Sequence, residues 1–558
     1  MRKRERQFFC YKFSSSRLKK QKYNIKTNFN EARRDNEIIA IGDNQILRSI
    51  RDIKNIRFDV EVVDSLYEER NKIKQLPPSK ENTLKIKNIQ AQINHLLFFP
   101  EYVTITIDNP KHYAEMFYGG VVINGVPYKR FSCSAGQART QTVVFCSCDI
   151  YDELKERLDN DRDKSIPIAP SKLNAYFGLY SSGTKLVTEP RFAVVADYSN
   201  KVRFKANFVT ETDAALDDEV EVREIEQELD RMDGMGLISP EMAKQWGEDM
   251  GLDYTPSQFV VRQSFLKGLL AVFDFKEFCK QKNGGNYLIK TIYKDDNGEY
   301  IYEDLRDCDA IISESQFKLW NSYKSKQQYI DCYHKNKLYW GVTQVAKKEY
   351  KEMSELNYQF LQALKLSNED ILELCKPFED KVGGVLLDNA CYSLLYLFGE
   401  IEDEEKLRNA IRSNEMLWKK CLALDQRIIQ DPYIEKQILK MINQSLNNAC
   451  LGKIPVKGNF QFLVTDPYAY MQFVCGQEPT GLLKEHECFS NYWIQRDADT
   501  VIGMRSPLTS PSEPCEWKVN HSEEAKYWYQ YNKNGVILNW FGNDVSKLAG
   551  ADKLYCPC

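Results

Sequence analysis

Two stretches of the chain have the composition of β-structure, and a long helical stretch lies between them. Within 101–310, short runs of β-branched and aromatic residues alternate with Gly and Pro turns. These runs include Tyr102–Ile107, Thr142–Cys146 and Phe192–Val195. The same character returns in 451–558, whereas 311–450 has few glycines and long amphipathic runs. This order predicts an α+β protein in which a helical connector joins two β-rich domains.

The first hundred residues are predicted to be mainly helical after a basic start. Residues 1–34 hold about a dozen Lys and Arg but only two acidic residues. They form either an arm that neutralises phosphates of a nucleic acid or a solvated, partly disordered tail. Beyond them, Ser65–Gln75 and Glu81–Leu97 carry apolar residues at helical intervals. Later in the chain, the acidic stretch Glu211–Asp230 is expected to be an exposed helix or a solvated loop.

Length and composition fit a globular protein with two to four domains. The chain has 558 residues, of which 43% are hydrophobic and 28% charged. No apolar run approaches the 18 or so residues that a membrane helix needs, so no membrane contact is expected. The 16 cysteines are scattered and no export signal precedes them, which predicts reduced thiols and a cytoplasmic protein.

Common small-enzyme signatures are absent from the sequence. There is no GxxxxGK[ST] phosphate loop, no HExxH zinc motif and no GxSxG nucleophile elbow. Five histidines are too few and too dispersed for a convincing catalytic triad. These absences disfavour hydrolases and dehydrogenases.

A glycine-rich junction begins at Met232 and ends at Pro240. Its two glycines, Gly234 and Gly236, permit a tight backbone path. Ser239 then has the features of a helix N-cap with Pro240 at the first helical position. The same pattern also fits any junction between a strand, a turn and a helix.

Two basic blocks follow. The first runs from Gln258 to Arg262 and continues at Lys267-Gly268-Leu269-Leu270. Burying its charges is costly unless they are paired or face a ligand, although an edge strand with solvated charges is an alternative. The second block, Ile311–Trp320, contains Lys318, and it could equally be the exposed start of an amphipathic helix.

Two further blocks lie near the end of the chain. Arg505-Ser506-Pro507 is an Arg–x–Pro turn that could hold a guanidinium against sugar or phosphate oxygens. The second block, Leu548–Asp552, ends on a single aspartate.

In their order and spacing, these blocks resemble those of the cellular RNA-dependent RNA polymerases, the enzymes of RNA silencing, over residues 110–552. The resemblance implies two double-psi β-barrels that face one cleft. It divides the chain into a basic arm and helical region (1–100), a β-rich domain with the first barrel (101–310), a helical connector (311–450) and the second barrel (451–558).

The resemblance also implies roles for individual residues. Asp552 would be a Mg²⁺ ligand, Lys267 and Lys318 would neutralise phosphates at the catalytic centre, and Arg505 would position the nucleotide sugar. The remaining implied site residues are Pro507, which would rigidify the Arg505 turn, and Gln258 and Arg262, which would shape the cleft wall or contact nucleic acid. The reaction would transfer a nucleotide from an NTP to an RNA 3′ end, on an RNA or single-stranded DNA template.

One departure from the family pattern is pronounced. In the family this region continues into a D-x-D-G-D loop whose carboxylates hold Mg²⁺, whereas Asp552 is followed by Lys553–Cys558. The chain is therefore expected to be truncated and inactive as it stands. Two alternatives stay open: a non-catalytic nucleic-acid-binding remnant, and a structural scaffold of a phage or mobile element. The abundance of Lys, Asn, Tyr and Ile suits an AT-rich bacterial or phage genome.

Overall fold

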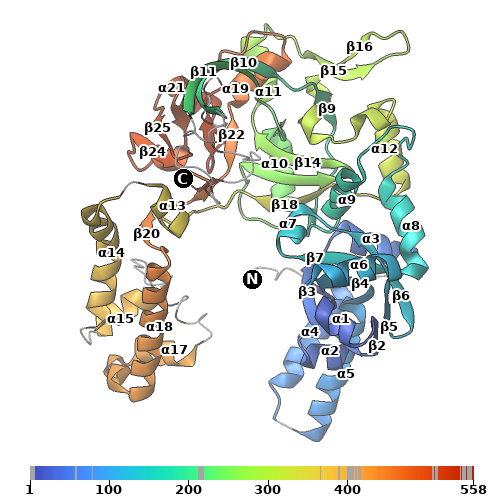
Figure 1. The fold of residues 1–558 in the computed structure, drawn as a ribbon, viewed down its shortest axis with the longest axis vertical. Helices are drawn as coiled ribbons and strands as arrows, with labels where there is room; N and C mark the ends of the chain where they lie inside the picture. Colours follow the sequence, from blue (N-terminus) through green and yellow to red (C-terminus); the bar gives the residue numbers. More distant parts are fainter. Residues whose placement is uncertain are drawn as a thin grey trace.

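A computed structural model describes most of the chain. It covers residues 7–56, 60–77, 79–210, 219–364, 366–386, 390–398, 408, 411, 416–505, 508, 513–540, 542, 544, 548 and 556–557. Figure 1 shows an N-terminal domain in blue and cyan, a central β unit in green, a helical connector in yellow and orange, and a second β unit in orange and red. The connector and the N-terminal domain extend from the pair of β units toward the same side of the molecule.

The N-terminal domain is built on one seven-stranded sheet, in the order β2-β5-β6-β7-β4-β1-β3. Its strands are β1 Gln7–Ser14, β2 Asn24–Ile25, β3 Ile38–Gly42, β4 Phe98–Thr106, β5 Val121–Ile123, β6 Val126–Ser132 and β7 Thr142–Ser147. Its helices are α1 Ser15–Lys20, α2 Phe29–Arg34, α3 Gln45–Ile53, α4 Val60–Lys74, α5 Lys80–Leu97, α6 Pro110–Gly119, α7 Ala135–Arg139, α8 Cys148–Asp159 and α9 Pro170–Leu179. The helices α4 and α5 confirm the two helices predicted from the sequence.

Strand β1 overturns the interpretation of the basic N-terminus as an arm or tail. It pairs with β3 on one side and with β4 on the other. Alternate side chains enter opposite cores, with Phe8 and Cys10 on one face of the sheet and Tyr11 and Phe13 on the other. From Gln7 onward, apolar residues between the basic ones thus make this stretch a central strand. The domain boundary expected after residue 100 falls inside the same sheet.

The first β unit (residues 185–345) holds a second seven-stranded sheet, in the order β8-β18-β13-β14-β12-β17-β9. Its strands are β8 Lys185–Leu186, β9 Phe192–Val195, β12 Met235–Ile238, β13 Gln258–Gln263, β14 Leu266–Val272, β17 Ala310–Ser313 and β18 Gly341–Val345. Strand β12 runs parallel to β14, and β9 runs parallel to β17, while the other pairs are antiparallel. Around the sheet lie α10 Pro240–Asp249, α11 Phe275–Lys282, α12 Lys326–Lys335 and three short 3-10 helices, η1 Leu305–Asp307, η2 Glu314–Gln316 and η3 Trp320–Ser322.

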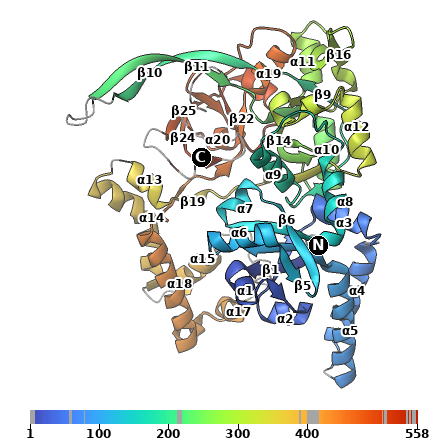
Figure 2. The same cartoon turned by 45° about the vertical axis from the view of Figure 1, so that its right-hand side comes forward.

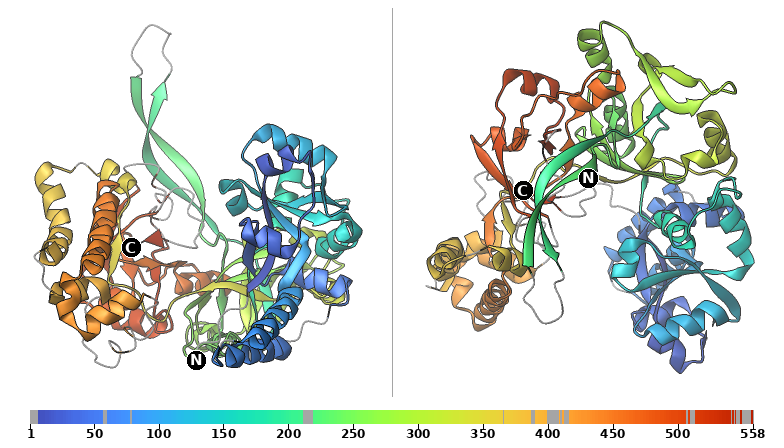
Figure 3. Two further views of the ribbon diagram at one scale, coloured as in Figure 1. Left: turned by 90° about the horizontal axis from the view of Figure 1, so that it is seen from below. Right: turned by 45° about the horizontal axis from the view of Figure 1, so that its top comes forward.

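Two hairpins extend from the first β unit. One consists of β15 Leu288–Lys294 and β16 Tyr300–Asp304, and the other of β10 Ser199–Thr210 and β11 Glu219–Asp230. The second hairpin projects beyond the rest of the molecule as a long twisted ribbon (Figures 2 and 3). For residues 219–230 it contradicts the prediction of a helix or loop, because the acids of β11 pair across the ribbon with β10, as in the Lys201–Glu226 and Arg203–Glu226 ion pairs. Residues 211–218 lie outside the described part of the chain.

The connector is mainly helical, as predicted, but it begins after β18 and not at residue 311, because β17 and β18 are strands of the sheet of the first β unit. Its helices are α13 Tyr358–Ala363, α14 Asn368–Leu386, α15 Ala390–Phe398, α17 Leu417–Leu424, η4 Gln426–Gln430 and α18 Pro432–Cys450. At its base, β19 Met353–Glu355 pairs antiparallel with β20 Pro455–Lys457, so the chain leaves and re-enters the β units at one place (Figure 1).

The second β unit (residues 460–540) contains a five-stranded sheet in the order β22-β26-β23-β25-β24. Its elements are β21 Phe460–Gln461, β22 Leu463–Thr465, α19 Pro467–Val474, β23 Glu487–Phe489, α20 Asn491–Ile494, β24 Thr500–Gly503, β25 Cys515–Val519, α21 Glu523–Trp528 and β26 Val536–Leu538, with a terminal strand β27 Cys556–Pro557 that pairs with β21. One hydrophobic cluster contains residues of both β units, among them Leu237, Leu269, Val464 and Ile537. The two units therefore share a core.

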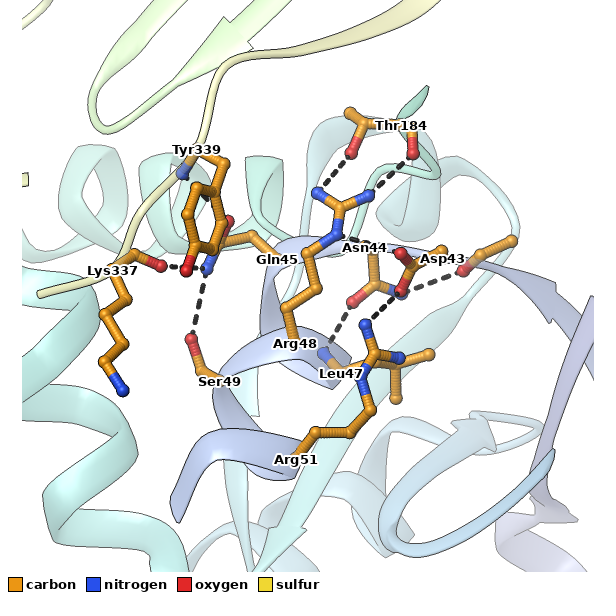
Figure 4. A network of polar contacts seen from close by, with 11 residues as sticks. Asp43, Asn44, Gln45, Leu47, Arg48, Ser49, Arg51, Thr184, Lys337 and Tyr339 are labelled. Atoms are coloured by element: carbon orange, nitrogen blue, oxygen red, sulfur yellow. Dashed lines mark hydrogen bonds and ion pairs between the residues drawn. The ribbon is translucent and has the colours of Figure 1, made fainter. Parts of the chain in front are cut away.

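A polar network fastens the N-terminal domain to the first β unit (Figure 4). The guanidinium of Arg48 is 5% exposed and donates to the hydroxyl (2.9 Å) and carbonyl (2.7 Å) of Thr184, while its Nε contacts Asp43 at 2.9 Å. Beside it, Gln45 bonds the Lys337 carbonyl at 3.2 Å and the Tyr339 amide at 3.3 Å. Because the buried charge of Arg48 is paired and hydrogen-bonded, this junction fixes the two bodies against each other.

The cysteines of the described residues are free thiols. Within the same residues, no helix combines the length and apolar character needed to cross a membrane.

Candidate active site

Three of the short blocks singled out in the sequence meet at one place in the first β unit. The buried side chain of Gln316, in η2, lies over the backbone of β12 and β14, where its Nε2 donates to the Leu269 carbonyl at 3.0 Å. A Cβ atom on Gly236 would lie 2.5 Å from Oε1 of Gln316, and one on Gly268 would lie 2.5 Å from the Gly234 carbonyl oxygen. Both glycines are thus required by a close approach that a larger residue would prevent.

A chain of hydrogen bonds extends this junction. The Gly234 amide, at a residue with φ of +68°, donates to Oγ of Ser315 at 2.9 Å. The same hydroxyl donates to the Asp197 carboxylate at 3.0 Å, just after the end of β9. At the other end of β12, Ser239 caps α10 by accepting from the Met242 amide at 3.2 Å, as the sequence predicted.

The register of β13 and β14 defines the face on which Lys267 lies. Residues directly opposite each other in an antiparallel pair lie on the same face, and every second residue along a strand does too. Lys267 is opposite Arg262, and the next pair on the same face is Leu269 opposite Val260. Leu269 and Val260 belong to the core shared with the second β unit. Lys267 therefore extends the face of the sheet that packs on the second unit.

Lys318 lies on the neighbouring backbone segment. Its amide donates to the Phe265 carbonyl at 2.9 Å, and Phe317 forms an isolated antiparallel bridge with Leu266. The structure thus brings the segments of Lys318 and Lys267 side by side, and both side chains are partly exposed. The sequence also allowed the block Ile311–Trp320 to be the start of an amphipathic helix. In the structure, the residues just before Lys318 form only the single 3-10 turn η2.

Gln258 lies in the junction between the two β units. It is fully buried, and its Nε2 donates to Oδ1 of Asn532 in the second unit. The neighbouring Ser257 accepts from the Lys533 amide at 3.0 Å. This geometry gives Gln258 a place in the wall between the units.

Arg262 lies near the N-terminal domain. It lines a small cavity of about 20 Å³ together with Arg48 and Tyr339, and its Nη1 donates to the Val261 carbonyl at 2.7 Å. Burial lowers the pKa of the Arg262 guanidinium to about 10. Within the described residues, Arg262 has no carboxylate partner in hydrogen-bonding range.

The remaining predicted residues lie at the end of the second unit. Arg505 follows β24, the edge strand of the five-stranded sheet, and is partly exposed. Just before it, Gly503 leaves room for the buried ring of Trp517, which a Cβ atom would overlap. Pro507 and Asp552 lie outside the described residues, so their predicted roles remain predictions.

The predicted metal ligand, Asp552, therefore lies outside the described residues. Within the described residues, no group of three or more His, Cys, Asp or Glu side chains is placed to hold a metal ion. The predicted Mg²⁺ site depends on Asp552, and the described part of the chain supplies no alternative set of ligands.

Three residues that build the junction were not predicted from the sequence as individual site residues: Asp197, Ser315 and Gln316. Burial raises the pKa of the Asp197 carboxyl to about 6, and the nearby charge of Asp230 adds to the shift, while the hydrogen bond from Ser315 opposes it. The sequence did contain a signal for this junction, namely the motifs around Gly236 and Gly268. A glycine that is required because a Cβ atom would clash implies that another side chain packs directly on its backbone.

Asp197→Asn is expected to stabilise the protein at neutral pH. A carboxyl whose pKa is higher in the folded state than its ordinary 3.8 destabilises the fold once ionised, so its cost is complete above about pH 6 and disappears as the pH falls toward 4. Allowing for screening at a partly exposed group, the variant should gain roughly 1–2 kcal/mol at pH 7.5 and nothing at pH 4. Thermal unfolding of both proteins across this pH range measures the difference.

Asp163→Asn is the matched control. Hydrogen bonds from Ser165 lower the pKa of this exposed carboxyl, so the substitution should not stabilise the protein at neutral pH. An Asp197→Asn midpoint displaced equally at pH 4 and pH 7.5 would contradict the assignment of a raised pKa.

Comparison with known proteins decides the family. A family model described as RNA dependent RNA polymerase matches residues 64–513, which is most of the chain. The chain belongs to the RNA-dependent RNA polymerase family. It is also 22% identical over 427 residues to the DNA-directed RNA polymerase YonO of Bacillus phage SPbeta, covering 74% of this chain and 46% of that one.

A solved structure is also similar to this chain. It is the RNA-dependent RNA polymerase QDE-1 from Thielavia terrestris, with a TM-score of 0.47 and 13% identity, covering 82% of this chain and 49% of that one. The chain thus spans about half the length of both relatives. The family resemblance drawn from the short blocks is confirmed by the family match.

Proposed function

We propose that this chain forms the nucleotide- and template-holding part of an RNA polymerase. The reaction is nucleotidyl transfer from an NTP to the 3′ end of a growing RNA, with release of pyrophosphate. The observation that carries the proposal is the convergence of three family blocks on one junction, with Lys267 on the face of the first β unit that packs on the second. The pattern of parallel and antiparallel strand pairs supports the finer proposal that each β unit is a double-psi barrel.

The proposed roles follow from charge. An NTP brings several negative charges, and positively charged groups held by rigid strands lower the cost of gathering them. Lys267 and Lys318 neutralise phosphate oxygens, and Arg505, with its fixed fork of donors, holds the sugar in a turn that Pro507 rigidifies. Gln258 and Arg262 keep the wall of the site in place. A divalent metal, Mg²⁺ with Asp552 as one ligand, would align the reacting oxygens when bound.

The template is proposed to be RNA, in line with the family match, and single-stranded DNA is the second candidate. The second candidate rests on the similarity to a phage enzyme whose name states that it is DNA-directed. Both templates present the same backbone phosphates, so contacts with the phosphates alone do not separate them.

Equilibrium binding tests the proposal against the two alternatives. The full chain is titrated with a fluorescent NTP in Mg²⁺, alone and with a single-stranded RNA or DNA template, at several salt concentrations. The proposal predicts NTP binding as well as salt-dependent template binding. Template binding without NTP binding would instead support the non-catalytic remnant, and binding of neither would support the scaffold. A stronger preference for RNA or for DNA decides the template.

A further inference from the structure

The N-terminal domain contains a cavity of about 500 Å³, remote in sequence from the residues proposed above. Helices α6, α8 and α9 all pack against β6 around it. Its floor is apolar, formed by the buried rings of Phe131 and Phe177, whose centroids are 6.1 Å apart. Its size and apolar floor suit one flat ring system with room for a polar substituent.

Aromatic rings at the rim of this cavity are exposed to solvent. Tyr118 is 87% exposed and Phe117 is 46% exposed, at the end of α6. Their rings meet edge to face with centroids 5.1 Å apart. A third ring, that of Tyr151, is fixed by a hydrogen bond from its hydroxyl to the Arg130 carbonyl at 3.0 Å. Exposed rings above an apolar floor offer stacking surfaces that the fold itself does not use.

Three cations are arranged around these rings. The ammonium groups of Lys129 and Lys155 lie 5.8 and 6.0 Å from the centroid of Tyr151, and the guanidinium of Arg130 lies 5.7 Å from that of Phe117. Arg130 also donates to Asn174 at 3.0 Å, which orients it, while its Nε is buried and donates no hydrogen bond within the described residues. The combination of stacking rings and cations is typical of sites for single-stranded nucleic acids.

The charged side chains that line the cavity are those of Lys129, Arg130 and Lys155, all of them positive, whereas Asp152, whose charge acts on Tyr151, does not line it. No Asp or Glu lines it in the described part of the chain, and neither lysine forms an ion pair there. Two carboxylates, those of Glu101 and Asp149, lie near Tyr128 in the wall of the cavity. Both form ion pairs with Lys54, at 3.1 and 2.9 Å. The cavity therefore favours an anion.

The helix ends agree with this preference. Helices α8 and α9 both begin at the cavity, with Cys148 and Pro170 among its lining residues. Neither N-terminus has a side-chain cap from its N-cap residue. Because Asp149 lies in the first turn of α8 and Pro170 has no N–H, the amides available to an anion are those of Ser171 and Lys172 in α9.

We propose that this cavity binds a nucleotide unit, with the base stacked on the exposed ring of Tyr118 and in edge contact with Phe117, and the phosphate held by Lys129 and Lys155. The ligand chemistry is an aromatic base joined to a phosphate, which a single-stranded nucleic acid and a free NTP both provide. This site is additional to the proposed polymerase site and does not depend on Lys267 or on any residue of the second β unit.

Photo-crosslinking of the full chain tests the site directly. The probes are a ten-nucleotide single strand that carries 5-iodouridine, as RNA and as DNA, and the corresponding iodinated UTP. The expected result is a crosslink in the peptide that contains Phe117 and Tyr118. If the oligonucleotide crosslinks there and the free nucleotide does not, the ligand is a single strand, and the reverse result identifies a free nucleotide. Crosslinks confined to other peptides for all probes would overturn the proposal.

Affinity measurements with variants provide the second readout. Tyr118→Ala changes an exposed ring and should weaken binding of the crosslinking probe about 5- to 100-fold through lost stacking. Lys129→Ala with Lys155→Ala should reduce the slope of log affinity against log salt by about 1.4 for a single strand, since each phosphate contact contributes about 0.7.

The matched control is Lys290→Ala with Lys294→Ala. These two lysines also lie over a tyrosine ring, that of Tyr300, at 3.5 and 4.7 Å, on an exposed hairpin far along the sequence. If this pair lowers affinity and the salt slope as much as the Lys129 and Lys155 pair, binding reflects general surface charge and the cavity is not the site. Loss of NTP binding in Lys267→Ala with an intact Tyr118 crosslink would show that the two sites are separate.

Discussion

Lys267→Ala is expected to weaken NTP binding about 10- to 100-fold, the effect of losing one charge-assisted contact to phosphate. Lys267 lies two residues before Leu269 on the strand face that forms the core shared with the second β unit. Because the proposed contact is with phosphate, the affinity for the corresponding nucleoside should not change. Competition of NTP and nucleoside against a fluorescent nucleotide measures both quantities in one experiment.

Two control variants make this test specific. Lys280→Ala removes a lysine of α11 that is mostly exposed and ion-paired with Glu277 at 3.5 Å, and it should leave NTP affinity unchanged. Lys267→Arg keeps the charge and should retain much of the affinity. Equal losses for NTP and nucleoside in Lys267→Ala would contradict a phosphate contact and indicate a general disturbance of the fold.

Gly268→Ala is expected to destabilise the protein by about 3–5 kcal/mol, since it combines overpacking with broken buried hydrogen bonds. The added methyl would lie 2.5 Å from the Gly234 carbonyl oxygen, which belongs to the backbone of the adjacent motif, and would overlap the amide of Gln316. Displacing Gln316 would break its bonds to the Leu269 carbonyl and the Ser313 amide, each 3.0 Å long. The midpoint of thermal unfolding measures this loss.

Gly136→Ala is the control for this substitution. No atom lies within 4 Å of a Cβ built on Gly136, which lies in α7 and has an ordinary backbone conformation. Alanine should be neutral or slightly stabilising there because it favours the helix. Combining Gly268→Ala with Gln316→Ala should restore part of the lost stability, by removing one of the two overlaps. A Gly268→Ala protein as stable as Gly136→Ala would show that the three blocks do not pack as described.

Much of the fold could be predicted from periodicity. Runs of β-branched and aromatic residues located strands such as β7 and β9, and the apolar residues at helical intervals located α4 and α5. The N-cap at Ser239 followed from the residue types, because a hydroxyl followed by a proline is typical of a helix start. In each case the signal was local, so the sequence sufficed.

The failures came from pairing partners distant in the sequence. Strand β1 is basic in composition, yet β3 and β4 bury its apolar residues from both sides. Strand β11 is strongly acidic, and it is a strand because it pairs along its whole length with β10, whose basic residues face several of its acids. For the same reason Asp197 and Gln316 were missed at the candidate site, since their importance arises from contacts across the sheet.

A structure determined with bound NTP would show whether the junction between the two β units is the nucleotide site. We expect the triphosphate in this junction, with its oxygens within hydrogen-bonding distance of Nζ of Lys267 and beside the segment of Lys318. A triphosphate bound elsewhere, with Lys267 making no contact to it, would show that the junction is not the nucleotide site.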